Sequence, residues 1–439
     1  LGTNPSTLTV TGEITANGGI ALGDGDILTL GDSDEFKIRH HASGYTHLQN
    51  TVGTLYIDSD SVTFRDDDGS PSNMVISQTG IDVTGTINGV GINVIETGSI
   101  LVSNDGGTGT ISSALRNTGL GFEVFDDLTS GDDNTGIGRK ALTKLTTGGG
   151  NTATGSGSLT AHTTGDSNTA FGVSALASNT TASNNTAVGS SALLSNTTAS
   201  YNTAVGKSAL TANTTGNLNV AMGYEALGVN VAGDKSVAVG VQALYAQNPS
   251  GNADMFNTAV GYSAGAAVTT GVDNTLIGGL AGDALVVANK NVAIGKSALS
   301  SDTYGHNSVA IGWSALAEQN FTSTTNTYNT AVGYYAGAAV TTGTLNTLIG
   351  GLTGDAITTG QANTALGYRS LSATTTASSN TAIGVDSLGS NTTGTSNTAV
   401  GRDTLNQQTT ASYNTALGHQ ALNLNTSGAS NTASGYRAL

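Results

Sequence analysis

A short motif with a 17-residue period dominates the sequence. There are 19 copies; 16 of the 18 intervals between them match this period, and the two that begin at Ser236 and Ser308 are longer, at 21. A fixed period of this kind predicts a chain that winds into a stack of equivalent turns, with the longer intervals forming loops at one corner. The first residues of the copies are 117, 134, 151, 168, 185, 202, 219, 236, 257, 274, 291, 308, 329, 346, 363, 380, 397, 414 and 431.

One turn, numbered from position 1 to position 17, reads N-T-A-V-G-x-S-A-L-x-x-N-T-T-G-x-x. Position 5 is glycine in all 19 copies. A position that never carries a side chain indicates either a positive φ or a second backbone too close for a Cβ. These structural glycines are Gly121, Gly138, Gly155, Gly172, Gly189, Gly206, Gly223, Gly240, Gly261, Gly278, Gly295, Gly312, Gly333, Gly350, Gly367, Gly384, Gly401, Gly418 and Gly435.

Positions 2 and 4 carry the residues that suggest a strand. Position 2 is Thr in 15 copies and Val in four, and position 4 is apolar in 17. Side chains alternate along a strand, so we expect positions 2 and 4 to face the interior together and the Leu at position 9 to close the core. In the turn that begins at Asn202, this assigns Thr203 and Val205 to the inside, with Leu210 behind them.

Four copies depart from this pattern in the same way. Position 9 is glycine in them, and an apolar residue stands at position 12 instead, which predicts a variant turn whose core residue is displaced by three places. The pairs are Gly265 with Val268, Gly282 with Leu285, Gly337 with Val340 and Gly354 with Ile357.

These patterns predict an all-β fold, a fibrous parallel β-solenoid or β-roll. Gly, Thr and Asn are poor residues for a helix interior, and a 17-residue period with a glycine in every turn does not suit a helix. In a stacked coil equivalent residues lie about 4.8 Å apart, so 19 turns span roughly 90 Å and the Asn at position 1 forms an amide ladder along one edge. The inward set is thin for a free-standing coil, so we expect partner chains to contribute to burial.

The sequence divides into an acidic β-rich segment at 1–92, a junction at 93–116 and the repeat rod at 117–439. Residues 1–133 hold 19 acidic against 4 basic side chains, whereas residues 134–439 hold 11 against 10. Alternating runs such as Phe36–Arg39 and Leu55–Asp58 are strand-like. Residues 112–116 are compatible with a short helix before the first turn.

Several repeats resemble known fibre families. Asn307-Ser-Val-Ala-Ile-Gly312 is similar to the head repeats of trimeric autotransporter adhesins, and the longer NTAVGxxAL…NTTG form resembles stalk repeats of phage tail fibres that end in a self-cleaving chaperone. The stretch from Leu30 to Asp60 resembles segments of marine phage tail fibres, which favours the phage. The resemblance implies a left-handed β-roll in a homotrimer.

Composition excludes several other classes of protein. The chain has no cysteine, so neither disulfides nor thiolate metal sites can form. No apolar run approaches the ~20 residues that cross a bilayer, so no membrane insertion is expected. No basic stripe is present, so nucleic acid is not an expected partner. The first residue is Leu1 rather than Met, which indicates a processed or truncated start.

Two groups of residues in the first segment are candidates for metal binding, although the metal itself stays unknown. Four aspartates in short Gly-Asp loops could hold Ca²⁺, against the more ordinary interpretation as solvated turn residues; Asp66-Asp67-Asp68-Gly69 indicates a hairpin turn. Three histidines could meet their copies on a threefold axis, against the more ordinary interpretation as surface residues. The residues are Asp24, Asp26, Asp32, Asp34, His40, His41 and His47.

The rod offers few other sites. Isolated histidines at 162, 306 and 419 indicate nothing. Five Asn-Thr-Thr/Ser sequons at position 12 match the glycosylation pattern, but the repeat explains them without a glycan. Trp313, Tyr334 and Tyr335 could stack on sugars or pack at subunit edges. Acidic residues do not recur as pairs at a fixed turn position, so no enzyme and no cofactor is expected. The sequons are at Asn179, Asn196, Asn213, Asn391 and Asn425.

These observations predict a structural component of a homotrimeric fibre, a phage tail fibre that holds a host-receptor-binding tip. The alternative is a bacterial surface adhesin or extracellular filament subunit, and a third class is ice binding by Thr ladders. The expected partners are two copies of the chain, other fibre or virion proteins, and a host cell-surface glycan or protein. The expected location is the virion or the cell surface.

Overall fold

The computed structural model describes residues 27–30, 36–41, 45–50, 86–87, 90–95, 99–103 and 114–439. The chain forms two units, Leu1–Asp82 and Val83–Leu439. In the first unit, β1 (Ile27–Leu30), β2 (Phe36–His41) and β3 (Tyr45–Asn50) form an antiparallel sheet.

The second unit begins with three strands that lead into the coil. β4 (Thr86–Ile87) and β5 (Val90–Ile95) pair antiparallel, as do β5 and β6 (Ser99–Ser103). β6 pairs in parallel with the first strand of the coil, so the sheet extends before the first repeat. The expected helix before the first turn is wrong for its described part, Ala114–Arg116, which is irregular. Arg116 has a φ of 57°, in the left-handed region.

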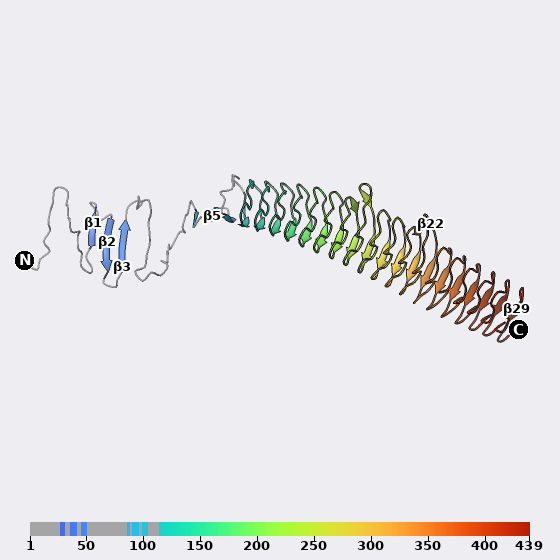
Figure 1. The fold of residues 1–439 in the computed structure, drawn as a ribbon. Coiled ribbons are helices and arrows are strands. Elements are labelled where there is room, and N and C mark those ends of the chain that lie inside the picture. The colour runs from blue at the N-terminus through green and yellow to red at the C-terminus, as the bar shows by residue number, and fades with distance from the viewer. Residues whose placement is uncertain are drawn as a thin grey trace, which may run out of the picture. The chain divides into compact units, whose positions relative to one another are not determined.

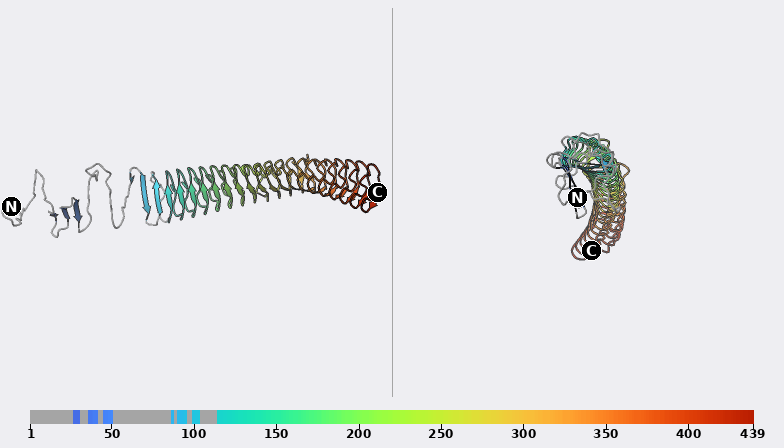
Figure 2. Two further views of the ribbon diagram at one scale, coloured as in Figure 1. Left: turned by 90° about the horizontal axis from the view of Figure 1, so that it is seen from below. Right: turned by 90° about the vertical axis from the view of Figure 1, so that its left-hand side faces the viewer.

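The rod is a parallel β-solenoid of 19 turns, as the repeat predicted (Figure 1). Each turn supplies a three-residue strand at positions 2 to 4, which pairs in parallel with the strands of the neighbouring turns; Thr203 lies opposite Thr186 and Val220. Two further views show the same stack of rungs from other sides (Figure 2). The nineteen strands are β7 (Thr118–Leu120), β8 (Thr135–Ile137), β9 (Thr152–Thr154), β10 (Thr169–Phe171), β11 (Thr186–Val188), β12 (Thr203–Val205), β13 (Val220–Met222), β15 (Val237–Val239), β17 (Thr258–Val260), β18 (Thr275–Ile277), β19 (Val292–Ile294), β21 (Val309–Ile311), β23 (Thr330–Val332), β24 (Thr347–Ile349), β25 (Thr364–Leu366), β26 (Thr381–Ile383), β27 (Thr398–Val400), β28 (Thr415–Leu417) and β29 (Thr432–Ser434).

The remaining residues of a turn fold back through two consecutive tight turns. In the turn at Asn202, the amide of Ala209 donates to the carbonyl of Gly206 at 3.3 Å and that of Asn213 donates to the carbonyl of Leu210 at 3.1 Å. Further backbone bonds reach neighbouring turns, such as Leu210 N to Ala226 O at 3.0 Å. Backbone pairing between turns therefore continues well beyond the three-residue strands.

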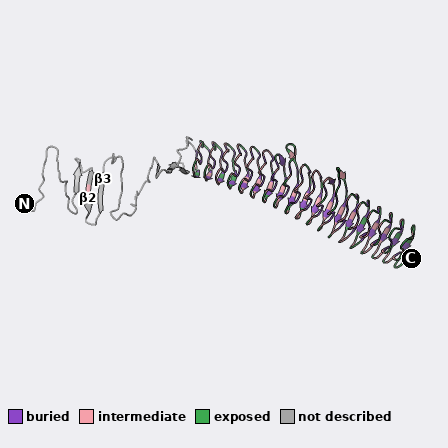
Figure 3. Ribbon diagram, in the orientation of Figure 1, coloured by how far each residue is buried: buried purple, intermediate pink, exposed green. Residues whose placement is uncertain are grey.

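Position 3 faces the core, and the predicted inward orientation of positions 2 and 4 is wrong. Ala204 is fully buried, whereas Thr203 and Val205 on either side of it are only half-buried. The same alternation holds in all 19 strands of the coil, and buried residues run through the whole stack (Figure 3). The β-branched residues at positions 2 and 4 therefore lie on the outer face of the sheet, and the prediction for Leu210 is confirmed, because it is fully buried.

The core volume is shared among positions 3, 9 and 12. Most turns combine Ala at position 3 with Leu at position 9, and the Leu side chain is buried although its backbone lies in the left-handed region, as at Leu210 with a φ of 50°. Burying Leu is worth about 1.5–3 kcal/mol, which offsets the ~1–2 kcal/mol cost of a left-handed non-glycine residue.

The four variant turns redistribute this volume. Their position 12 side chains are buried, as the displaced-core prediction required. Two of them also carry Leu at position 3, Leu276 and Leu348, and a Cβ on Gly265 or Gly282 would lie 2.6 or 2.8 Å from the Leu276 side chain. The leucine thus fills the space that two glycines leave empty.

The Asn at position 1 forms the predicted amide ladder, and the ladder is buried. The backbone amide of Asn202 donates to Oδ1 of Asn185 at 2.9 Å, and the side-chain Nδ2 of Asn202 donates to the carbonyl of Gly216 at 2.9 Å. Its own Oδ1 accepts from the amide of Asn219 at 3.0 Å. The side-chain amide of each Asn in the ladder thus pairs with backbone groups inside the narrow core, where water cannot reach them.

The two 21-residue turns belong to a longer repeat that is four turns long. We call residues 236–307 the first cassette and residues 308–379 the second cassette; each has one long turn, two glycine-variant turns and one ordinary turn, and 38 of 72 positions are identical. Each long turn forms a loop with a two-residue strand that pairs with the preceding turn. These strands are β14 (Gly233–Asp234) with β16 (Ala253–Asp254), and β20 (Gly305–His306) with β22 (Thr325–Asn326).

Candidate functional site

Exposed apolar side chains gather on one part of each turn, around the outer face of the sheet. Among the described residues, 29 large apolar side chains are exposed, and 25 of them stand at position 4, at position 6 or directly before position 1. Since position 4 faces outward in every strand, its side chains form an apolar row, interrupted at Thr154 and Ser434, which we call the outer stripe. The exposed members of the outer stripe are Leu120, Ile137, Phe171, Met222, Val260, Ile277, Ile349, Leu366 and Leu417.

Position 6 forms a second column, which mixes aromatic residues with valines, cations and small residues. Trp313 and Tyr334 lie one turn apart, with ring centroids 5.1 Å apart, and Tyr335 lies against both, at 5.2 and 4.6 Å. Trp313 is 43% and Tyr334 is 50% exposed, so the three rings that the sequence singled out form one cluster open to solvent. Two turns further along the same column stands Tyr368, 51% exposed.

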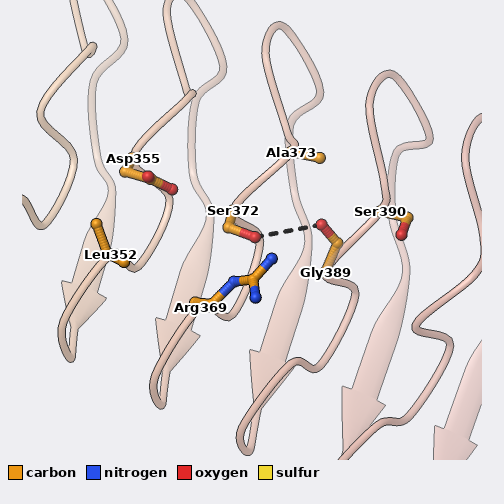
Figure 4. A pocket seen from close by; sticks show the side chains of 7 residues that line it. All are labelled: Leu352, Asp355, Arg369, Ser372, Ala373, Gly389 and Ser390. Carbon is orange, nitrogen blue, oxygen red and sulfur yellow. Dashed lines mark hydrogen bonds between the residues drawn. The ribbon is translucent and has the colours of Figure 1, made fainter.

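A shallow cavity of about 560 Å³ lies beside this column, at the corner formed by positions 7, 10 and 11 of successive turns. Figure 4 shows the Arg369 guanidinium extending toward Ser372 and Gly389, with the Asp355 carboxylate on the preceding turn. The hydroxyl of Ser372 donates to the carbonyl of Gly389 at 3.3 Å. The lining residues are Leu352, Asp355, Arg369, Ser372, Ala373, Gly389 and Ser390.

The electrostatics of the cavity depend on one guanidinium and two carboxylates. Nε of Arg369 lies 3.7 Å from Oδ1 of Asp386. Burial raises the pKa of Asp355, and the charge of Arg369 opposes that rise. Oδ1 of Asp355 is buried and has no hydrogen-bond partner, and the Asp355 carboxylate and the Arg369 guanidinium both line the cavity. Sequence reasoning missed this site, because its residues come from three different turns.

The equivalent corner of the first cassette has the same backbone and a different charge. Asp283 stands where the second cassette has Asp355; its Oδ1 is likewise buried without a partner, and burial raises its pKa. Ser297 replaces Arg369, and Glu318 stands in the place of Ser390. Only the corner of the second cassette therefore combines the carboxylate with a cation.

Position 12 is an interior position, which changes the meaning of the sequons. Asn179, Asn196, Asn213 and Asn391 are fully buried, and each donates Nδ2 to the carbonyl three residues later. A glycan cannot be attached to these nitrogen atoms in the folded chain. Asn425 is partly buried and makes the same bond.

His162 and Asp302 also occupy position 12. Burial lowers the pKa of His162, whose Nε2 contacts the carbonyl of Gly165 at 2.8 Å. Asp302 is fully buried, and burial raises its pKa. The other two isolated histidines lie elsewhere: His306 Nδ1 accepts from the amide of Asn289, and the ring of His419 lies 5.5 Å from that of Tyr436.

The paired threonines at positions 13 and 14 differ in exposure. The hydroxyl at position 13 donates to a carbonyl of the next turn, as Thr180 does to Thr197 at 3.2 Å, and only position 14, as at Thr181, is exposed. Along the stack, the Thr pairs thus present one row of hydroxyls to solvent, that of position 14, and not two.

The predicted metal sites fall largely outside the described residues. This holds for Asp24, Asp26, Asp32 and Asp34 and for the Asp66–Gly69 turn, whereas the backbones of His40 and His41 lie in β2 and that of His47 in β3. Over the part of the chain that the structure describes, no group of three histidine or acidic side chains could hold a metal ion.

No described segment forms a helix long and apolar enough to cross a bilayer. Comparisons with known proteins give no relative: the chain matches no protein family model, no curated protein and no solved structure.

Proposed function

We propose that this chain forms the rod of an extended homotrimeric fibre, a phage tail fibre that holds a host-receptor-binding tip. The observation that carries the proposal is the outer stripe, an apolar row on the outer face of a long stack of turns. Single exposed apolar residues are common on soluble proteins, but a contiguous row marks an interface.

The energetics favour burial of the outer stripe against copies of the same chain. Fully burying one Val, Leu or Ile side chain is worth about 1.5–3 kcal/mol, and these side chains are already half-buried. Seventeen such positions would together contribute on the order of 10 kcal/mol or more, which is comparable to the ~4–15 kcal/mol cost of association. A second copy has the same row at the same rung spacing, so three outer stripes could meet around one axis along the rod.

The same features support a mechanical role rather than catalysis. Backbone and Asn-ladder hydrogen bonds connect each turn to its neighbours, so stiffness is distributed along the rod. A fibre rod needs this property, together with a side-to-side interface that does not end after a few turns.

A bacterial surface adhesin is the alternative, supported by the resemblance of the Asn307–Gly312 repeat. In both a phage tail fibre and an adhesin, the solenoid would serve as a stiff spacer. The two assignments differ in the domain expected downstream of the solenoid. A chaperone-type domain encoded downstream of residue 439 would favour the phage fibre, and a membrane-anchor barrel would favour the adhesin.

Mass photometry of the wild-type chain and of V205K/V239K tests the assembly. Val205 and Val239 face outward, so the double variant should keep its far-UV circular dichroism spectrum while the trimer dissociates. T198K, at an exposed position away from the outer stripe, should remain trimeric. A monodisperse wild-type monomer, or a trimer unaffected by V205K/V239K, would contradict the proposal.

A further inference from the structure

We infer that the corner of the second cassette between Trp313 and Arg369 is a binding site for a neutral oligosaccharide. The site combines the exposed cluster of Trp313, Tyr334 and Tyr335 with the adjoining cavity at Asp355 and Arg369. It uses side chains of a single chain, so it does not depend on the proposed trimer.

The geometry of the site follows from the register of the turns. The amide of Tyr335 donates to the carbonyl of Trp313 at 3.0 Å, that of Leu352 to the carbonyl of Tyr334 at 2.8 Å, and that of Arg369 to the carbonyl of Gly351 at 3.1 Å. Trp313 and Arg369 are thus three rungs apart, about 14 Å at ~4.8 Å per rung. This length suits an extended ligand of a few sugar rings lying along the rod.

Gly351 leaves a gap in the aromatic column. It stands at position 6 between Tyr334 and Tyr368, and a Cβ there would have only the Tyr368 ring nearby, at 3.7 Å. A larger residue at position 351 would fill the surface between the two tyrosines. With glycine there, the surface between the three-ring cluster and the cavity stays unobstructed.

The chemistry of the site matches a sugar with both apolar and hydroxyl-bearing faces. Aromatic rings bind apolar surfaces through their faces, and exposed rings side by side offer several such contacts. Arg369 presents several fixed donors, and Asp355, Ser372 and Ser390 add oxygen-bearing side chains to the lining. A few polar groups at the edge of a largely apolar surface are typical of small-molecule sites.

The charges favour a neutral ligand over an acidic one. Arg369 lies between Asp355 and Asp386, so the corner carries one positive and two negative charges when all three groups are ionised. An acidic saccharide would meet net repulsion from these groups.

The first cassette shows that the fold does not require these side chains. At the equivalent positions it has Val241 for Trp313, Ser263 for Tyr335 and Ser297 for Arg369. Its backbone pairing is the same, with Ser263 N donating to Val241 O at 2.9 Å. Since the same backbone forms without two aromatic rings and a guanidinium, this fold does not require these three side chains.

The two cassettes provide matched variants for the test. W313V/Y335S/R369S gives the second cassette three residues of the first, each already compatible with this backbone. V241W/S263Y/S297R makes the reciprocal change. The full-length proteins would be applied to an array of neutral, acidic and amino oligosaccharides, and the best neutral oligosaccharide would be titrated by isothermal calorimetry.

The wild-type chain should bind neutral oligosaccharides with one site per chain. W313V/Y335S/R369S should weaken binding at least tenfold with an unchanged circular dichroism spectrum, and V241W/S263Y/S297R should raise the number of sites toward two. No retention of neutral sugars, a preference for acidic sugars, or equal binding by W313V/Y335S/R369S would overturn the inference. Mass photometry of the same samples reports the trimer separately.

Discussion

The carbonyl oxygen of Gly223 lies 2.6 Å from the point where a Cβ on Gly206 would stand. Gly206 also has a φ of +133°, which L side chains rarely adopt. The glycine at position 5 is thus fixed for two independent reasons, a backbone conformation and the close approach of the next turn. The same two features recur in turn after turn, although Gly435, in the nineteenth turn, keeps only the positive φ.

Replacement of Gly206 by alanine should destabilise the coil locally by roughly 2–4 kcal/mol, because the new Cβ meets backbone atoms that cannot move independently. Long repeat arrays do not unfold in a single two-state step, so hydrogen–deuterium exchange is the appropriate measurement. Peptides covering the turns at Asn202 and Asn219 should exchange faster than in the wild-type chain.

Gly251 provides the control, since a Cβ there would have no atom within 4 Å and its φ is not in the left-handed region. G251A should leave exchange unchanged. Equal protection in G206A and G251A would show that position 5 does not require the absence of a side chain.

Asn202→Ala should weaken the buried amide ladder. The substitution leaves the backbone amide of Asn219 without a partner, whereas the carbonyl of Gly216 still accepts from Nδ2 of Asn213; a buried unpaired group costs about 1–3 kcal/mol. Exchange at the amide of Asn219 should therefore accelerate by at least tenfold, while T198A, at an exposed position, should change nothing. Unaltered protection of Asn219 in N202A would mean that the ladder contributes little to stability.

Leu276 and Gly282 should show strong energetic coupling. L276A leaves a cavity and should cost about 2–5 kcal/mol, whereas G282L alone inserts a side chain where the Leu276 side chain already lies 2.8 Å from the added Cβ. The double variant L276A/G282L has Ala at position 3 and Leu at position 9, as in ordinary turns, although Leu285, whose Cδ1 also lies 2.8 Å from the added Cβ, stays in place. Because L276A removes one of the two close contacts, the double variant should be destabilised less than the sum of the two single variants. The double-mutant cycle can be read from chemical denaturation combined with exchange; simple additivity would refute the shared-volume account.

Asp302→Asn should stabilise the fold at neutral pH and not at acid pH. Burial raises the pKa of Asp302 above its unfolded value, although Gln319 donates Nε2 to its Oδ2 at 2.6 Å and Gly305 donates its amide to its Oδ1 at 3.0 Å. The folded chain therefore holds this proton more tightly than the unfolded chain does. The resulting stabilisation is complete below the unfolded pKa of about 3.9 and is lost as the pH rises through the folded value.

The advantage of D302N should thus be absent below about pH 3.9, grow as the pH rises and become constant once Asp302 is ionised in the folded chain. Thermal melting and exchange of residues 302–327 between pH 3 and pH 8 measure it. D273N removes a carboxylate from an exposed position and should show no such profile. A D302N advantage independent of pH would show that the carboxylate is not the cause.

The period, the number of turns and the parallel stack were all predictable from the sequence, because a constant 17-residue register brings like residues together in every rung. The position 5 glycines and the position 1 amide ladder were predictable for the same reason. A residue that recurs at one position of every turn indicates that the backbone has the same conformation or needs the same hydrogen bond there in every turn. Leu210 was placed correctly in the core, since a large apolar residue at a fixed position has few other roles.

Which face of the strand lies inside became clear only from the packing of the folded chain. Thr203 and Val205 have the residue types of a buried strand face and yet lie outside, because Ala204 is small enough for the narrow core. A three-residue strand carries too little alternation to fix its own orientation. The corner at Asp355 and Arg369 could not be predicted from the sequence either, because its residues come from separate turns and are brought together only by stacking. In addition, Asp355 and Arg369 stand at positions that vary from turn to turn, so the repeat pattern does not single them out.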